Sequence, residues 1–310
     1  MLIKKCVKKF SFLFLLGWGS LSAQQRTVDF RLIGNIETVQ SVTYLYGNQS
    51  QTAVSGFLDH EEFDSVFLKF DRRRNLVLRE NYLDYRGKLG LFNRIINQIN
   101  PSNQLEKSET TLVQNAEEPR KISQRKIHYY LKNQLIRTDE FNSGRTSDQF
   151  WVMNSTYKNG EIAQKTFWME DEIFSVDKFS YDSKGLVESE QNYYNNGTKG
   201  KSVSYEYSHG QLLKKTTRSG NETTIETFTY DKALLAQHSF SENGKTIWTK
   251  TYDDNGLLSE LKKFNHSTQQ TDTYSFEFEL DSKNNWTKCD VFKNQTPIYV
   301  TRRNLKYFNN

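Results

Sequence analysis

Cysteine and proline are the scarcest features of this 310-residue chain, and each scarcity excludes something. The two cysteines are Cys6 and Cys289, and Cys6 lies within an expected export signal, so no internal disulfide framework is expected. Cys289 shares its strand parity with Thr287 and Val291, and we interpret it as a small packed hydrophobe. Only three prolines occur, which favours long uninterrupted strands, because proline cannot donate a hydrogen bond to a sheet.

Catalytic and metal-binding motifs are also missing. The five histidines are dispersed, and neither an HExxH motif nor the Cys-His spacing of a zinc site occurs. No GxSxG nucleophile turn or glycine-rich phosphate loop is present. The segment Asp253-Asp254-Asn255-Gly256 lacks the ligand spacing and the distal glutamate of a calcium loop. We therefore expect no metal and no cofactor.

Aliphatic residues are few. Hydrophobic residues make up 35% of the chain, aromatic residues 14%, and the mean hydropathy is −0.78. Globular domains have about 45–50% apolar residues when glycine is counted. Many tyrosines with few aliphatic residues favour a thin sheet, which tyrosine can cover while its hydroxyl reaches water. No apolar run approaches the ~20 residues that a membrane span needs.

The first 23 residues are interpreted as an export signal. Four lysines precede an apolar run at 10–16, and Leu-Ser-Ala at 21–23 forms a small-residue cleavage site. Gln24 stands where a lipid-anchored protein has cysteine, so no lipid anchor is expected. The mature protein is predicted to lie in the periplasm or outside the cell.

The basic charge is largely that of the signal. The chain has 42 basic and 37 acidic side chains, and residues 1–23 hold four lysines and no acid, which leaves 38 against 37. The remaining basic pairs, such as Lys214-Lys215 and Lys262-Lys263, are isolated rather than clustered on one face. Nucleic-acid binding is therefore not expected.

A short phrase recurs and organises the chain. Tyr181-Asp182-Ser183-Lys184-Gly185-Leu186 returns as Tyr252-Asp253-Asp254-Asn255-Gly256-Leu257, with looser copies at 157–162, 207–212 and 230–234. Successive anchors from Tyr130 to Leu280 are 27, 24, 26, 23, 22 and 28 residues apart. Such a recurrence indicates one small unit stacked on itself. Twelve residues are assigned a structural role in the repeat: Tyr157, Tyr181, Asp182, Gly185, Tyr207, Gly210, Tyr230, Asp231, Tyr252, Asp253, Gly256 and Asp281.

Each repeat predicts two strands and two turns. Asn196-Gly197 and Asn243-Gly244 are strong hairpin signals, because both residue types tolerate positive φ. Turns about every 10–14 residues leave strands of about 6–8 residues. Tyr274, Phe276 and Phe278 alternate with polar residues, as in a strand with one covered face. The predicted fold is all-β, an antiparallel β-hairpin repeat meander with little helix, either a curved single sheet or a partly closed β-shell.

The amino-terminal part is less regular. Residues 24–123 are interpreted as a β-rich capping region with degenerate repeats, and residues 124–310 as the hairpin repeats, because terminal repeats are usually atypical. Apolar residues at helical spacing predict a short helix at 89–99, and the polar stretch 101–123 predicts a long loop.

The recurring aromatic-Asp-x-x-Gly-Leu phrase resembles the YD-repeat (Rhs-type) family. The resemblance covers residues 125–308 well and 63–90 weakly, and the stretch 278–288 is similar to the ending of small exported members from Bacteroidetes-type bacteria. In that ending Leu280 replaces the tyrosine and Asn284 the glycine. In large members the repeats wind into a hollow β-shell that encloses a toxin. This chain has no Asp-Pro cleavage motif and, by our expectation, too few repeats for a closed shell.

Two classes of function remain. The leading hypothesis is a secreted, non-catalytic interaction scaffold that binds a protein or a glycan through its repeat surface. The candidate ligand contacts are the aromatic residues Trp151, Trp168, Trp248 and Trp286, for which sheet covering is the alternative role. The alternative function is an exported carbohydrate-active hydrolase with a carboxylate pair from different repeats. An outer-membrane barrel is disfavoured by the short strands and the low hydropathy. Exposed sheet ends allow self-association.

Overall fold

The computed structural model describes residues 32–52, 64–84, 88–113, 121–143 and 148–309. The predicted export signal, residues 1–23, lies outside these ranges. Within them, every regular element is a strand. The strands are β1 (Ile36–Leu45), β2 (Asn48–Thr52), β3 (Ser65–Phe70), β4 (Leu76–Asp84), β5 (Leu89–Ile99), β6 (Leu105–Leu112), β7 (Lys121–Leu131), β8 (Gln134–Ser143), β9 (Asp148–Lys158), β10 (Glu161–Met169), β11 (Glu172–Tyr181), β12 (Val187–Tyr194), β13 (Lys199–Ser208), β14 (Gln211–Ser219), β15 (Glu222–Asp231), β16 (Leu234–Glu242), β17 (Lys245–Tyr252), β18 (Leu258–Asn265), β19 (Gln270–Leu280), β20 (Trp286–Lys293) and β21 (Thr296–Tyr307).

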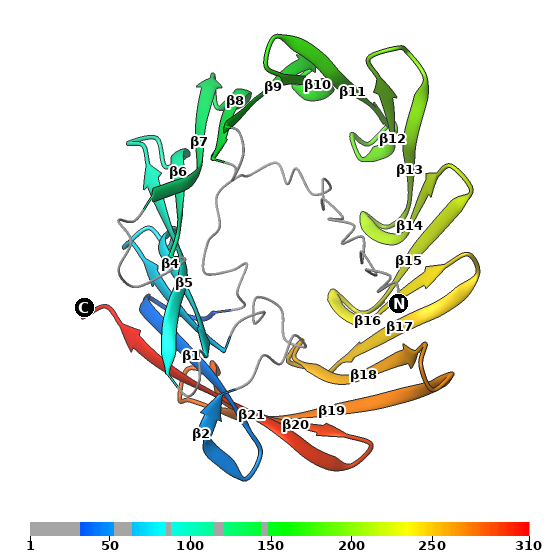
Figure 1. The fold of residues 1–310 in the computed structure, drawn as a ribbon. Coiled ribbons are helices and arrows are strands. Elements are labelled where there is room, and N and C mark those ends of the chain that lie inside the picture. The colour runs from blue at the N-terminus through cyan, green and yellow to red at the C-terminus, as the bar shows by residue number, and fades with distance from the viewer. Residues whose placement is uncertain (1–31, 53–63, 85–87, 114–120, 144–147, 310) are drawn as a thin grey trace, which may run out of the picture.

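The sheet closes on itself (Figure 1). From β3 to β21 each strand pairs antiparallel with the next along the chain, and β1 pairs with both β3 and β21, so twenty strands form a ring. Among the described strands, the short β2 pairs only with β1 and stands outside the ring. The all-β antiparallel prediction is confirmed, whereas the expectation of too few repeats for closure was wrong. Closure depends on the long β1–β21 pairing, which runs from Ile36 opposite Tyr307 to Leu45 opposite Tyr299.

Two local predictions in the amino-terminal part were also wrong. Residues 89–99 form β5 rather than a helix, and the expected loop at 101–123 contains β6 and the start of β7. The apolar residues of β5 are not confined to one side, since Ile95 and Ile96 point to opposite faces of the sheet. Most strands of the ring have 8–12 residues, longer than predicted, so strand length does not argue against a membrane barrel.

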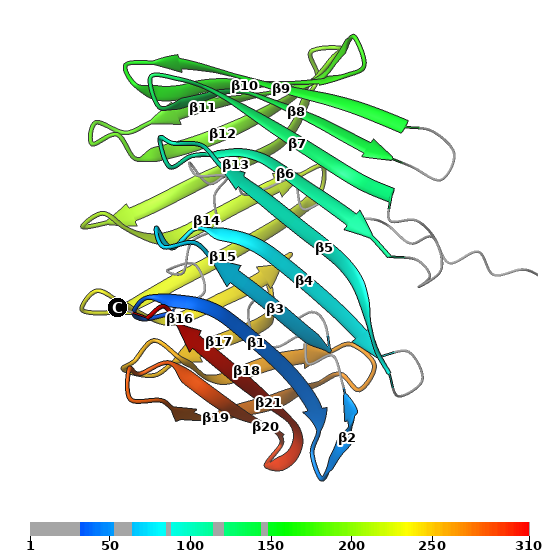
Figure 2. The same ribbon diagram turned by 90° about the vertical axis from the view of Figure 1, so that its left-hand side faces the viewer.

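The recurring aspartate organises its turn through backbone hydrogen bonds. Oδ1 of Asp182 accepts from the N–H groups of Lys184 (2.8 Å) and Leu186 (2.9 Å), and Asp253 accepts in the same way from residues two and four positions later. Gly185, the residue before Leu186, has a left-handed backbone with φ +79°, a conformation that glycine adopts without strain. Because alternate turns of a meander lie at opposite ends, all these turns share one end of the ring, which we call the repeat rim (Figure 2).

The recurring tyrosines connect successive repeats. The hydroxyl of Tyr157 donates to the carbonyl of Leu135 at 2.9 Å, and that of Tyr181 donates to the carbonyl of Ile162 at 2.9 Å. Tyr130 and Tyr230 make the corresponding bonds, both at 3.0 Å, to the carbonyls of Leu105 and Leu212. Each acceptor lies just after the turn of the preceding repeat. The recurring phrase therefore forms a turn and also a hydrogen bond to the preceding repeat.

The two faces of the ring differ in exposure. In β11, Ser175 is buried and Asp177 and Phe179 are half-buried, whereas Lys178 and Ser180 on the other side are exposed. Side chains on the concave side of a closed sheet converge and shield one another, and interior and exterior residues alternate along each strand. We therefore assign the face with Asp177 to the inside and follow it around the ring through the strand registers.

The outer face carries ion pairs between neighbouring strands. Lys214 on β14 lies 2.9 Å from Glu206 on β13, and Lys288 on β20 lies 2.8 Å from Glu279 on β19 and also 2.8 Å from Asp290 on its own strand. Charged side chains therefore lie on the outer face as well as on the inner face. No helix long and apolar enough to cross a bilayer occurs in the described part of the chain.

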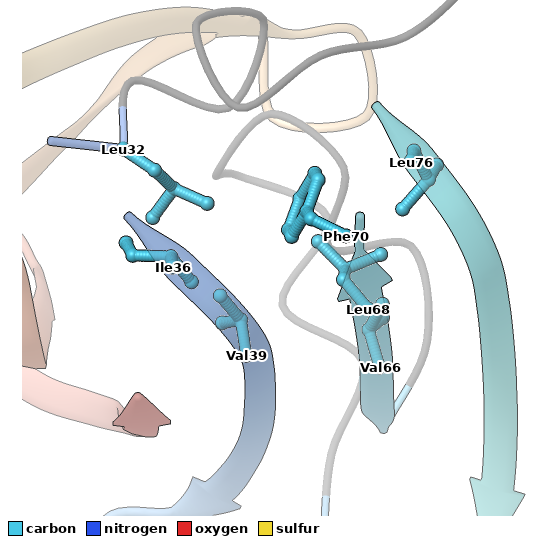
Figure 3. Close-up of a cluster of buried hydrophobic side chains, with 7 residues drawn as sticks. All are labelled: Leu32, Ile36, Val39, Val66, Leu68, Phe70 and Leu76. Carbon is cyan, nitrogen blue, oxygen red and sulfur yellow. The ribbon is translucent and has the colours of Figure 1, made fainter. Parts of the chain in front are cut away.

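The apolar core lies where the two ends of the chain meet. One buried cluster lies on β1, β3 and the start of β4, and Figure 3 shows its residues: Leu32, Ile36, Val39, Val66, Leu68, Phe70 and Leu76. A second cluster lies on β18–β20 and consists of Leu258, Leu261, Tyr274, Phe276, Trp286, Cys289 and Val291. Between them, the hydroxyls of Thr43 and Thr301 form a buried hydrogen bond of 2.9 Å across the β1–β21 seam. Both buried clusters therefore lie beside the seam that closes the ring.

Candidate binding site on the inner face

The inner face is divided into an apolar and a polar sector. The apolar sector holds the two core clusters and runs from β18 through β21 and β1 to the start of β4. From β5 to β17 the inner positions carry mostly polar, charged and aromatic side chains, and we call this part the polar sector. Its charges are paired across strands, as between Lys126 and Glu140 at 3.0 Å. This sector is the candidate site.

Glu226 is the centre of the most elaborate group in the polar sector. It lies on β15, where the alternation of the strand turns Glu226 and Phe228 inward. Lys215 on β14 is directly opposite, with its Nζ 2.8 Å from Oε1, and Nε2 of His238 on β16 lies 3.0 Å from Oε2. The carboxylate therefore bridges two basic side chains on the strands at either side.

Aromatic rings continue this group toward β17. The rings of Phe228 and His238 stack at 4.3 Å, and Trp248 meets His238 edge-on at 4.8 Å. Phe240 stacks on Trp248 at 5.7 Å. We name Lys215, Glu226, Phe228, His238, Phe240 and Trp248 the Glu226 cluster. All six are half-buried, so each keeps part of its surface toward the inside of the ring.

The pKa of Glu226 is lowered to about 2, first by the hydrogen bond with His238 and then by that with Lys215, against the opposing effect of burial. A carboxylate with this pKa stays ionised at neutral pH and does not serve as a proton donor there. Glu226 is therefore suited to hold its neighbours in place and to accept hydrogen bonds from a ligand.

Replacing Glu226 by glutamine is expected to flatten the acid dependence of stability. A carboxyl whose pKa falls from 4.5 to about 2 on folding stabilises the fold above pH 4.5, and this contribution disappears as the pH falls toward 2. Urea unfolding at pH 5.5 and pH 3 should show a smaller loss of unfolding free energy for Glu226→Gln than for the wild type. Glu206→Gln, which alters an exposed outer-face glutamate, is the control, and an equal effect of both changes would contradict the assignment.

A second group lies on β10–β13. Asn192 donates to Asp177 at 2.6 Å, and the Tyr205 hydroxyl donates to Glu190 at 2.5 Å. Lys165 is directly opposite Asp177, yet its Nζ lies over the ring of Phe179, 5.4 Å from the centroid. Burial raises the pKa of Asp177 and lowers the pKa of Lys165, because it penalises the charged form of each. Burial therefore opposes the charged forms in this group, whereas in the Glu226 cluster the hydrogen bonds favour the charged carboxylate.

A glycine keeps this second group open. A Cβ atom added to Gly200 would lie 2.3 Å from Oδ1 of Asn192 and 3.1 Å from the ring of Tyr194. The first distance is shorter than real Cβ contacts, so Gly200 leaves the space in which the Asn192 amide reaches Asp177.

Two buried polar side chains lie on the same face in β7 and β9. Nδ1 of His128 is 3.0 Å from the Thr138 hydroxyl, while Nε2 of His128 and Oγ of Ser155 have no hydrogen-bond partner in the structure as described. Burial, together with the charge of Lys126, lowers the pKa of His128 to about 4, so this ring is neutral at pH 7. No set of three or more His, Cys, Asp or Glu side chains suited to a metal ion occurs among the described residues.

The four predicted tryptophans are not brought together. Trp248 belongs to the Glu226 cluster, whereas Trp286 is buried in the second core cluster with the guanidinium of Arg303 3.4 Å from its ring centroid. Trp151 and Trp168 lie on adjacent strands but on opposite faces, because Trp151 is paired with Met169. Two of the four lie on the inner face of the polar sector: Trp248 in the Glu226 cluster, and Trp151 directly opposite Glu140 on β8.

Lys215, Glu226 and His238 were not predicted as site residues from the sequence. They are 11 and 12 residues apart, which is about one hairpin. The turns at Ser219-Gly220 and Asp231 to Leu234 place Lys215 directly opposite Glu226, and place His238 opposite Phe228, which is diagonal to Glu226 on the same face. The sequence pattern that could have identified them is the spacing that places all three side chains on the same face of three successive strands.

The comparisons with known proteins give only weak similarities. No protein-family model and no curated protein matches the sequence. A porin-like protein from Bacteroides uniformis aligns over 89% of this chain and 99% of its own, with 9% identity and a TM-score of 0.35. The TcdB2–TccC3–Cdc42 structure aligns over 76% of this chain and 16% of its own, with 13% identity and a TM-score of 0.31. A protein of unknown function from Bacteroides fragilis aligns over 39% of this chain and 86% of its own, with 16% identity and a TM-score of 0.17. Similarities this low carry no argument about function.

Proposed function

We propose that this protein is an exported, non-catalytic scaffold that binds a glycan chain along the polar sector of its inner face. The observation that carries the proposal is the Glu226 cluster, in which aromatic rings alternate with carboxylate, amine and imidazole groups. Sugars present apolar ring faces that stack on aromatic side chains and hydroxyls that hydrogen-bond to polar groups. A protein ligand is the other partner class for the same surface.

The pairing of charges favours a neutral ligand. Lys126 is paired with Glu140, and Lys215 with Glu226, so these inner charges do not sum to a strong field of either sign. A polyanion or a polycation gains most from an unbalanced surface of opposite charge. A neutral, hydroxyl-rich polymer gains from polar groups that are already oriented and from rings, and both are present here.

Trp248→Ala is expected to weaken glycan binding about 30-fold, because aromatic anchors at the centre of a binding surface typically contribute 2 kcal/mol or more. The full chain is first screened on a glycan array, and the affinity for the strongest glycan is then measured by calorimetry. Tyr193→Ala is the matched control, since Tyr193 lies on β12 with its side chain on the outer face. This control should bind as the wild type does.

The proposal fails if the array is blank, or if Trp248→Ala and Tyr193→Ala bind equally well. A blank array together with capture of a specific envelope protein that Trp248→Ala no longer captures would assign the same surface to a protein ligand instead.

The alternative of a carbohydrate-active hydrolase has one carboxylate pair to support it. Asp177 and Glu190 lie on neighbouring strands and on the same face. They are diagonal neighbours, because Glu190 is paired with Phe179, two residues after Asp177, and both are outside the recurring turn position. Burial raises the pKa of Asp177, as is useful for a general acid. Release of reducing ends from a bound glycan by the wild type but not by Asp177→Asn would establish this activity. Binding without release would leave the scaffold function standing.

We further propose that the chain is a small exported YD-repeat protein with a capping region at 24–123 and repeats at 124–310. The aspartate turns and the tyrosine bonds between repeats support this membership. Export is supported by the sequence of residues 1–23, and it is tested by fractionating cells that produce the full chain.

A further inference from the structure

The rim opposite the repeat rim carries a patch of exposed apolar side chains. Its members lie at the ends of β9–β12 and are between 37% and 48% exposed: Phe150, Met169, Ile173, Phe174 and Tyr194. The strands that carry them lie side by side at this rim, where Met169 shares the inner face with Trp151, Trp151 contacts the ring of Phe174 at 5.2 Å, and Phe150 points to the outer face. Exposed apolar groups that gather in this way mark interaction surfaces.

An acidic turn lies within this patch. Glu170, Asp171 and Glu172 form the tip between β10 and β11, and all three are exposed. The N–H of Glu170 donates to the carbonyl of Phe150 at 3.0 Å, which fixes the tip against the neighbouring strand. None of the three carboxylates has an ion-pair partner among the described side chains. We call the apolar patch and this turn together the acidic rim patch.

The repeat rim presents exposed lysines on the corresponding hairpins, where the neighbouring acidic residues are Glu161, opposite Lys158, and Asp182, whose Oδ1 accepts backbone hydrogen bonds. Lys132, Lys158 and Lys184 lie at the tips of three successive turns, between β7 and β12, and all three are exposed. Leu131, next to Lys132, is 59% exposed and supplies an apolar contact. Within the described ranges, none of these three lysines forms an ion pair. We call these four residues the lysine tips.

We propose that a second copy of this chain stacks on the first head to tail, with its lysine tips on the acidic rim patch. Charge complementarity selects this partner: lysines on three consecutive tips of one copy would lie against the acidic turn of the next, with apolar groups at both surfaces. The two surfaces lie on opposite rims of the same ring, so the contact is heterologous and repeats from copy to copy. An anionic membrane would be repelled by the carboxylates within the apolar patch.

The test uses two variants of the full chain, in one of which the charges of the acidic turn are reversed and in the other those of the lysine tips. Glu170→Lys/Asp171→Lys/Glu172→Lys and Lys132→Glu/Lys158→Glu/Lys184→Glu should each lower the association constant at least about 10-fold, measured by sedimentation over a range of concentrations. In an equimolar mixture, each reversed surface meets its complement on the other variant. Mixing should therefore restore association to within about 3-fold of the wild type, and added salt should weaken it.

The control variant is Lys69→Glu/Lys178→Glu/Lys262→Glu, which makes the same charge change at exposed lysines of the outer face, and it should associate as the wild type does. Circular dichroism checks that all variants fold. A wild type that stays monomeric at high concentration would overturn the proposal. So would two reversed variants that fail to restore association on mixing, or a control variant that loses association to the same extent.

Discussion

Replacing Asp281 by alanine is expected to lower the free energy of unfolding by about 3 kcal/mol, roughly twice the loss expected at Asp253. Both aspartates accept two backbone hydrogen bonds within their turns. Asp281 also accepts from the hydroxyl of Tyr307 at the end of β21. Its turn in addition presents Asn285, whose side chain donates to the Ile33 carbonyl at 2.9 Å and accepts from the Ile33 N–H at 2.7 Å.

The larger effect is expected because this turn joins three segments far apart in the sequence. Asn285 is 2% exposed, so its partners lose hydrogen bonds that water does not readily replace. Urea unfolding of Asp281→Ala, Asp253→Ala and Tyr307→Phe measures the difference. Combining Asp281→Ala with Tyr307→Phe should cost less than the two separate losses, because the two residues share one bond. Equal losses at Asp281 and Asp253 would show that the seam adds nothing to the turn.

Phe70→Ala is expected to cost about 3–5 kcal/mol, as is typical when a large aromatic side chain is removed from a core. Phe70 is 1% exposed and packs with Val39 and Leu68 in the cluster of Figure 3. The control is Phe67→Ala on the same strand, where the side chain points outward and is only half-buried. This change should cost about 1 kcal/mol.

Chemical denaturation followed by two probes tests whether the cluster around Phe70 stabilises the whole ring. If tryptophan fluorescence and far-UV circular dichroism shift together for Phe70→Ala, the cluster stabilises the whole ring. Similar midpoints for Phe70→Ala and Phe67→Ala would contradict the assignment of Phe70 to the core side.

Local sequence features predicted the local structure well. The Asp-x-x-Gly-Leu phrase predicts a turn because both its hydrogen bonds and its left-handed residue lie within five positions, as at Asp182 and Gly185. The segment 89–99 was mispredicted because its isoleucines satisfy helical spacing as well as the two faces of a strand. Ile96, with 44% of its surface exposed, shows that not every apolar residue there is covered.

Closure and the candidate site could not be predicted for a different reason. The pairing of Val39 with Leu305 joins residues from opposite ends of the chain, and no local pattern specifies it. Strand parity groups Glu226 with Phe228, but parity alone does not tell which group faces the inside. That information arises only when the sheet closes and one side becomes concave.

The union of β1 with β21 also restricts how such a protein can change over evolutionary time. An open array can acquire or shed a unit at either extremity while its other units stay as they were. Here an additional hairpin would widen the circumference and alter the angle between every pair of adjacent strands. Duplication of one unit is therefore expected to be tolerated only when compensating changes occur throughout the molecule, so the number of hairpins should vary less among descendants of this chain than the sequences of the hairpins themselves.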